Sequence, residues 1–210
     1  VGTHNLKAQF NGGYEHQPST SAIFTQPVTG TQATTTSLTA SPNPAALGAS
    51  VTLTANVTSA SGTPTGTVTF KDGSTDIGTA TLSGGVATLS ISSLAAGSHS
   101  ITAFYNGNAT HAFSTSMAAP LTIDPPVITV TTTSLASGTQ GTAYGPVTLA
   151  ASGGTGPYTF AAAGLPATMT LDPKTGVISG TPTSSGTFAV SVSAKDNSPE
   201  ASGGPFASAP

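Results

Sequence analysis

The sequence has 210 residues, which is enough for one large or two ordinary domains. Only 5% of the residues are charged, with four lysines, no arginine and a net charge of −3. Four scattered lysines cannot neutralise a row of phosphates, so the composition excludes nucleic-acid binding and polybasic attachment to anionic lipid.

The lack of cysteine removes disulfide frameworks and thiolate metal sites. No apolar run approaches the roughly 20 residues of a membrane span, so we expect no span in this segment. The sequence starts at Val1 without a signal peptide, and we expect a piece of a longer or processed protein. Hydrophobic residues make up 36% of the chain and alternate with polar ones, which favours a folded chain over a disordered one.

The first thirty residues have a counterpart further along the chain. Residues 2–12 resemble residues 97–107 at an offset of 95 with no gap, and the likeness continues through His16 with His111 and residues 19–21 with 114–116. A period of this size matches one β-sandwich of about 100 residues. We therefore interpret residues 1–30 as the C-terminal strands of a partial repeat.

Residues 34–124 form the next predicted domain, and its strands show the period of two that is typical of half-buried strands. The outward positions are mainly Thr and Ser, which suit a solvated pleated face. Tight turns are predicted at Asp72-Gly73, Gly84-Gly85 and Asn106-Gly107. The apolar positions that alternate are Val51, Leu53, Ala55 and Val57; Val68 and Phe70; Ala87, Leu89 and Ile91; and Ile101, Ala103 and Tyr105.

A stiff joint, Asp124-Pro125-Pro126, precedes the third predicted domain, residues 127–210. Its residue pattern differs from that of residues 34–124, with a glycine-rich stretch over 153–156 and a late predicted strand that contains Val190, Val192 and Ala194. We expect one more strand after Pro210. No segment shows a 3.6-residue stripe, so almost no helix is predicted anywhere.

Two sets of short motifs carry a resemblance to known families. One set lies within residues 34–124, at 35–38, 41–44, 48–55, 64–70, 94–99 and 105–108. By these motifs, residues 34–124 resemble the bacterial Ig-like domains that occur in tandem on large exported proteins. The other set lies at 165–166, 171–172, 175–182 and 186–188. By these motifs, residues 127–210 resemble the putative-Ig and cadherin-like repeats of bacterial surface proteins. Both resemblances imply an all-β fold of tandem immunoglobulin-like antiparallel β-sandwiches with Greek-key connections.

Two sets of side chains are candidate ligands for a metal. His4, His16, His99 and His111 have no acidic or second histidine partner nearby in the motif, so we interpret them as structural. Asp172, Asp196 and Asn197 lie at strand ends and offer the hard oxygens that calcium prefers, which makes them weak calcium candidates. Asp172 also fits a plain turn role in Asp-Pro-Lys-Thr-Gly.

Asn56 and Asn108 each begin an Asn-x-Thr sequon, so both are weak glycosylation candidates. No Gly-x-Ser-x-Gly elbow occurs, and the seven carboxylates are scattered without a marked pair. We predict that the segment is not an enzyme and needs no cofactor, calcium excepted.

The resemblances imply an extracellular or cell-surface bacterial protein whose sandwiches act as spacers, stalks, adhesive arms or fibre subunits. Our first hypothesis is a structural stalk or filament, self-assembling through open β-edges, whose partners are copies of itself or neighbouring repeats. One alternative is an adhesin module for glycan or another cell. Another is a set of accessory domains of a larger exported enzyme.

Overall fold

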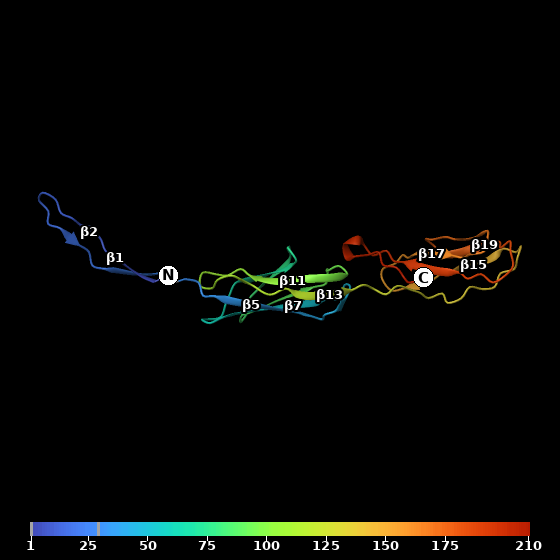
Figure 1. The fold of residues 1–210 in the computed structure, drawn as a ribbon, viewed down its shortest axis with the longest axis horizontal. Coiled ribbons are helices and arrows are strands. Elements are labelled where there is room, and N and C mark those ends of the chain that lie inside the picture. The colour runs from blue at the N-terminus through green and yellow to red at the C-terminus, as the bar shows by residue number, and fades with distance from the viewer. Residues whose placement is uncertain (1, 29) are drawn as a thin grey trace. The chain divides into compact units, whose positions relative to one another are not determined.

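The computed structural model describes residues 2–28 and 30–210, and its regular elements are β-strands apart from one short 3-10 helix, η1 (Glu200–Ser202). This confirms the predicted all-β class. The strands fall into three stretches of the chain: residues 2–28, residues 34–124 and residues 125–210 (Figure 1).

Residues 2–28 form a single antiparallel hairpin. Its lower part pairs β1 (Gly2–Leu6) with β4 (Phe24–Val28), and its upper part pairs β2 (Gln9–Phe10) with β3 (Ser19–Thr20). The register runs from Gly2 opposite Val28 to Leu6 opposite Phe24, and then from Gln9 opposite Thr20 to Phe10 opposite Ser19.

Residues 34–124 contain the same hairpin. Here β11 (Gly97–Tyr105) pairs with β13 (Ala119–Asp124) and β12 (Ser114–Thr115). Gly97 lies opposite Ile123, Ile101 opposite Ala119, and Tyr105 opposite Ser114. Every one of these pairs is a pair of the first hairpin shifted by 95 residues, so the sequence repeat is also a repeat of strand register.

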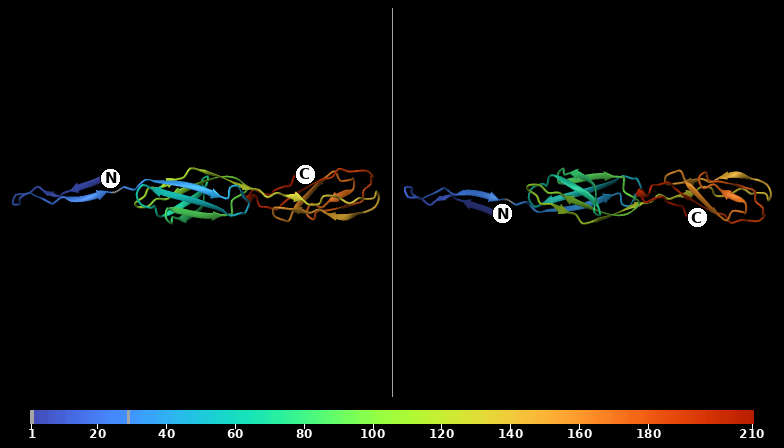
Figure 2. Two further views of the ribbon diagram at one scale, coloured as in Figure 1. Left: turned by 90° about the horizontal axis from the view of Figure 1, so that it is seen from below. Right: turned by 90° about the horizontal axis from the view of Figure 1, so that it is seen from above.

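The strands of residues 34–124 form two sheets, as expected for an Ig-like sandwich (Figure 2). One has the order β10-β7-β5 and the other β6-β13-β11-β8-β9, with β12 beside β11. The chain crosses between the sheets at each step from β5 to β8 and from β9 to β11, whereas β8–β9 and β11–β12–β13 each stay within one sheet. Such crossings are typical of Greek-key sandwiches. The remaining strands are β5 (Thr34–Ser41), β6 (Ala45–Ala46), β7 (Val51–Ser59), β8 (Thr67–Asp72), β9 (Thr75–Thr81) and β10 (Val86–Ile91).

Most of the alternating apolar residues found in the sequence lie in the core of this sandwich, although Leu89 and Ile91 are only half-buried. The core also contains residues outside that alternation: Ala45, Leu82, Leu94, Leu121 and Ile123. Val51, Leu53, Ala55 and Val57 are at most 1% exposed, whereas Thr52 and Asn56 between them are exposed. Because side chains alternate across a strand, β7 buries one face and presents hydroxyl and amide groups on the other. Each buried large apolar side chain contributes about 1.5–3 kcal/mol of transfer free energy, and this burial holds the sheets together.

Residues 125–210 form shorter sheets around a smaller core (Figure 1). The sheets are β14-β16, β15-β19-β18 and β17-β20, and the fully buried cluster comprises Ile128, Leu149, Phe160, Ile178 and Ala194. The strands are β14 (Thr129–Val130), β15 (Tyr144–Thr148), β16 (Ala151–Ser152), β17 (Thr159–Ala163), β18 (Met169–Leu171), β19 (Val177–Gly180) and β20 (Ser191–Lys195).

Candidate functional site

The histidines of the complete sandwich make hydrogen bonds to backbone carbonyls. His99 Nε2 lies 2.9 Å from the Ala95 carbonyl oxygen, and His111 Nε2 lies 3.0 Å from that of Ser61. A carbonyl oxygen only accepts, so each Nε2 donates. His4 and His16 are exposed on the first hairpin. Over residues 2–28 and 30–210 no three His, Asp or Glu side chains gather as a metal site would need.

Asp172 closes a turn with its side chain. Its carboxylate accepts hydrogen bonds from the backbone N–H groups of Lys174 at 2.9 Å and Thr175 at 3.2 Å. These two backbone bonds, then one from the Thr175 side chain, lower the pKa of Asp172. The residue is exposed, and the arrangement is the Asx turn that an Asp-Pro-Lys-Thr-Gly sequence favours.

Asp196 is buried, with 4% of its surface exposed. Its Oδ1 accepts from the N–H of Phe206 at 2.7 Å and of Ser198 at 3.2 Å, and its Oδ2 from the N–H of Thr155 at 3.0 Å and the Ser198 hydroxyl at 2.5 Å. Desolvation raises the pKa of this carboxyl, but the four hydrogen bonds together outweigh it, so the net pKa is lowered. One ionised side chain thus joins three stretches of backbone.

Asp172 shares no hydrogen-bond partner with the other two calcium candidates, whereas Asp196 and Asn197 both bond to the backbone of Thr155. The partners of Asp172 lie within its own turn, those of Asp196 lie at residues 155, 198 and 206, and Asn197 is exposed with its N–H bonded to the Thr155 carbonyl at 2.8 Å. Both oxygens of Asp196 already accept two donors each. A calcium ion at Asp196 would have to compete with these donors. Calcium binding by this trio stays a prediction.

The two sequon asparagines have different surroundings. Asn56 is exposed on the outward face of β7. Asn108 Nδ2 donates to the carbonyl and hydroxyl oxygens of Thr65 at 3.0 and 3.1 Å, and its Oδ1 accepts from the N–H groups of Thr110 and His111 and from the Thr110 hydroxyl. A glycan on Asn108 would replace an amide hydrogen that donates to Thr65. Of the two sequon asparagines, only Asn56 has a side-chain amide without a hydrogen bond among those described.

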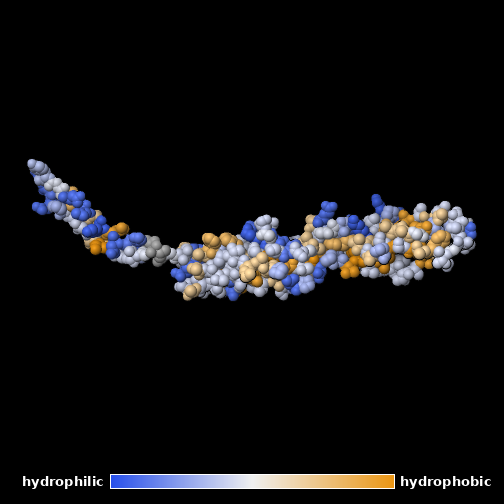
Figure 3. Space-filling view, in the orientation of Figure 1, coloured by the Kyte–Doolittle hydropathy of each residue, from blue (hydrophilic) through white to orange (hydrophobic). Residues whose placement is uncertain are grey.

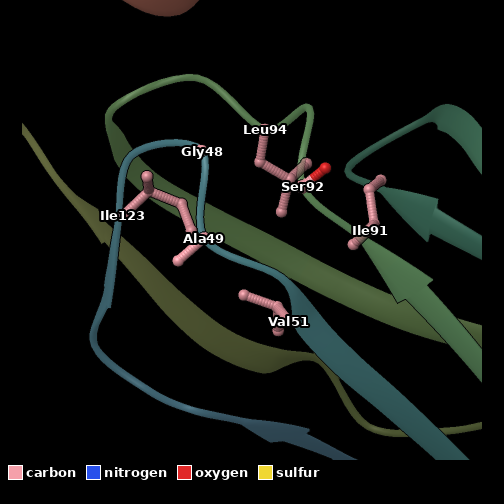
Figure 4. Close-up of a pocket in the computed structure, with 7 residues that line it drawn as sticks. All are labelled: Gly48, Ala49, Val51, Ile91, Ser92, Leu94 and Ile123. Carbon is pink, nitrogen blue, oxygen red and sulfur yellow. The ribbon is translucent and has the colours of Figure 1, made fainter.

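Neither of two hollows forms an enclosed pocket for a small ligand. One lies at an end of the complete sandwich, where Val51, Ile91 and Ile123 from both sheets converge with Leu94 (Figure 4), and it leaves no room for a water molecule. The other is an open groove of about 1360 Å³ in residues 126–210, lined in part by the core residues Ile128 and Leu149. The residues that line it are all uncharged.

A serine hydrogen-bond motif occurs three times, and its role was not predicted from the sequence. Ser116 Oγ accepts from the Ala103 N–H at 3.0 Å and donates to the Met117 carbonyl, while its own N–H donates to the Ala103 carbonyl at 2.9 Å. Ser21 with Ala8 and Ser208 with Ala194 repeat the exchange of backbone and side-chain bonds. The signal available in the sequence was the 95-residue offset between Ser21 and Ser116.

Two family models match successive stretches of the chain. Residues 38–124 match the bacterial Ig-like domain (group 3), and residues 125–207 match the family described as "Putative Ig domain". The chain carries two Ig-like domains in tandem. These Ig-like domains are of the kind typical of bacterial surface or exported proteins and are generally non-catalytic modules.

The tandem Ig-like domains also have a structural neighbour. It is described as "Structures of Clostridium thermocellum CbhA fibronectin(III)-like modules", with 20% identity, a TM-score of 0.35, and coverage of 82% of this chain and 89% of that one. No curated protein matches the sequence. In residues 2–28 and 30–210 the structure has no helix of the length and apolarity needed to cross a bilayer.

Proposed function

We propose that this chain is a run of structural repeats from an extracellular bacterial stalk or filament. The observation that carries the proposal is the repeat of register: the hairpin of residues 2–28 recurs, pair for pair, as β11 with β13 and β12. Modules repeated at a fixed spacing are suited to setting a distance, since each adds the same length.

The character of the outward strand faces supports this role. The exposed positions of β7 are Thr52, Asn56 and Thr58, which are neutral and hydrogen-bond with water or with sugar. Such a surface is little affected by salt and pH and carries little charge repulsion between neighbouring copies. We propose copies of the same chain, or neighbouring repeats, as its partners.

Particle length tests the proposal. Concatenated chains of one, two and three copies of residues 1–210 would be compared by electron microscopy and small-angle X-ray scattering. Each added sandwich should lengthen the particle by roughly 35–40 Å, the length of a strand plus its turns. Regular filaments in the native material would make the chain a fibre subunit, whereas rods of fixed length would make it a stalk. Compact particles that do not lengthen with copy number would contradict both.

An adhesin would behave differently in a binding assay. Glycan arrays and whole-cell binding with the single chain would detect a recognition function, which the spacer proposal does not need. Saturable binding by the isolated chain, abolished by a substitution in one loop, would favour the adhesin over the spacer.

A further inference from the structure

The first hairpin has an apolar face whose counterparts in the second hairpin are buried. We name Leu6, Ala8 and Phe10 the hairpin face. Leu6 is 58% and Phe10 51% exposed, and Ala8 is exposed as well. At the offset of 95 residues they correspond to Ile101, Ala103 and Tyr105, each 0% exposed. Figure 3 shows apolar surface on this hairpin beside strongly hydrophilic residues.

The two hairpins agree in detail beyond their register. The Ser21 bonds to Ala8 reproduce those of Ser116 to Ala103. Gly12 and Gly107 both take positive φ, 83° and 73°, and a Cβ at either would approach a histidine carbonyl oxygen, that of His16 or His111, to 3.0 Å or less. The first hairpin therefore already has the backbone shape that the second has inside a complete sandwich.

The complete sandwich shows what covers such a face. In its sheet β8 lies beside β11, on the edge that β13 leaves open. At the end of β11 the Tyr105 hydroxyl donates to the Thr65 carbonyl at 2.8 Å, and the Asn106 N–H donates to the Thr67 carbonyl at 3.1 Å. Residues 65–67 thus lie against the end of β11, and the buried side chains of β7 and β8, which precede the hairpin in the chain, share one core with Ile101, Ala103 and Tyr105.

We propose that the hairpin face is a docking surface for one occupant: a further strand set with the pattern of residues 34–91, supplied by the same polypeptide on the N-terminal side of β1. A second copy of this chain is a poor source. Its own strand set is already covered, with Val68 and Phe70 both 0% exposed, and would have to leave an intact core.

The experiment adds the proposed occupant to the full chain. A second copy of residues 30–95 is placed directly before residue 1, since residue 96 is the counterpart of residue 1. Backbone hydrogen exchange is then compared between the 210-residue chain and the extended one. In the extended chain we expect the paired amides of β1 and β4 to exchange about 100-fold more slowly, and a further cooperative unfolding transition to appear.

Matched variants separate docking from a general effect of the added segment. In the extended chain Leu6→Asp should abolish the slow exchange of β1 and β4, because its counterpart Ile101 is fully buried. Thr3→Asp should leave it unchanged, because its counterpart Ser98 is exposed. Phe10→Tyr should slow exchange further, since the new hydroxyl would meet the second copy of the Thr65 carbonyl.

Three results would overturn the proposal. One is unchanged rapid exchange of β1 and β4 in the extended chain. Another is equal sensitivity to Leu6→Asp and Thr3→Asp. The last is a concentration-dependent dimer of the 210-residue chain in which these amides are already protected, because a second copy would then be the occupant. All three concern hydrogen exchange or dimer formation and are independent of the particle lengths that test the spacer role.

Discussion

Asp196 holds separate stretches of the second Ig domain with a single carboxylate. Its two oxygens accept three backbone N–H groups and one hydroxyl, all from residues 155, 198 and 206. From the sequence, Asp196 is a calcium candidate because it is an acidic residue at the end of a predicted strand. The hydrogen-bond donors to Asp196 could not be predicted, because they come from loops up to 41 residues away along the chain.

Replacing Asp196 with Asn should destabilise the second domain by about 2 kcal/mol or more. Whichever oxygen becomes the amide, that NH₂ faces a backbone N–H, so a buried donor loses its acceptor. Asp172→Asn is the matched control, because that carboxylate is exposed and serves only its own turn. Urea denaturation followed by hydrogen exchange in β20 measures both. Equal losses from the two variants would contradict the role given to Asp196.

The Asp196 carboxyl also makes the free energy of unfolding depend on pH. The pKa of Asp196 is lower in the folded chain than its ordinary value, so its stabilisation is fully present above the unfolded pKa of about 3.9. That stabilisation is lost as the pH falls through the folded pKa. Unfolding free energy measured from pH 6 down to pH 2 should therefore fall more steeply for the natural chain than for Asp196→Asn. Parallel curves would show that Asp196 is not the group responsible.

In the Ig-like domain of residues 38–124, the Asn108 side chain likewise joins separate stretches of the chain. It bonds to Thr65 and to residues 110 and 111. We expect Asn108→Ala to cost about 2 kcal/mol, because several donors and acceptors lose partners together. Asn56→Ala, exposed on a strand face, should change stability by less than about 0.5 kcal/mol. Chemical denaturation of both variants decides the point. Similar small losses would mean that the Asn108 bonds are replaced by water.

Among the elements, the hairpins of residues 2–28 and 97–124 each have a serine where their two pairing regions meet, Ser21 and Ser116. Ser116 is 7% exposed and exchanges bonds with Ala103, which is fully buried. Ser116→Ala should cost about 1–3 kcal/mol, because the Ala103 N–H loses its acceptor away from water. The backbone amide hydrogen of Ala103 should also exchange faster with solvent. The control is Thr115→Ala, because Thr115 is exposed and lies one residue earlier. An equal loss of stability in the two variants would contradict the stabilising role given to Ser116.

Strands with regular alternation could be predicted from the sequence, and others could not. The alternation over 51–57, 68–70, 87–91 and 101–105 placed β7, β8, β10 and β11 correctly, because the apolar residues on one face of each strand are buried or half-buried. The strand β9, with sequence Thr-Asp-Ile-Gly-Thr-Ala-Thr, gives no such signal because it pairs only with β8 at a sheet edge. Hydrogen-bond hubs such as Asp196 depend on tertiary contacts, which periodicity does not encode.

For the whole molecule, scarce charge predicts stability that is insensitive to salt. The ion pair of Lys71 with Asp76 is solvent-exposed, at 33% and 62% for the two side chains, and such pairs contribute at most about 1 kcal/mol. Raising NaCl from about 0.05 to 0.5 M should shift Tm by less than about 2 °C. Calorimetry checks this, with Lys71→Met as a matched variant. A large salt-dependent shift would indicate a charge network that the described contacts do not contain.

The identity of register between the two hairpins has a consequence for how such a protein changes over generations. A crossover between the coding regions for residues 2–28 and 97–123 would join β1 of one unit to β13 of another without moving a single backbone pair. Unequal recombination could therefore lengthen or shorten the array by whole modules and leave every junction foldable. The length of the array would then change in fixed steps while the backbone register of the hairpin is kept.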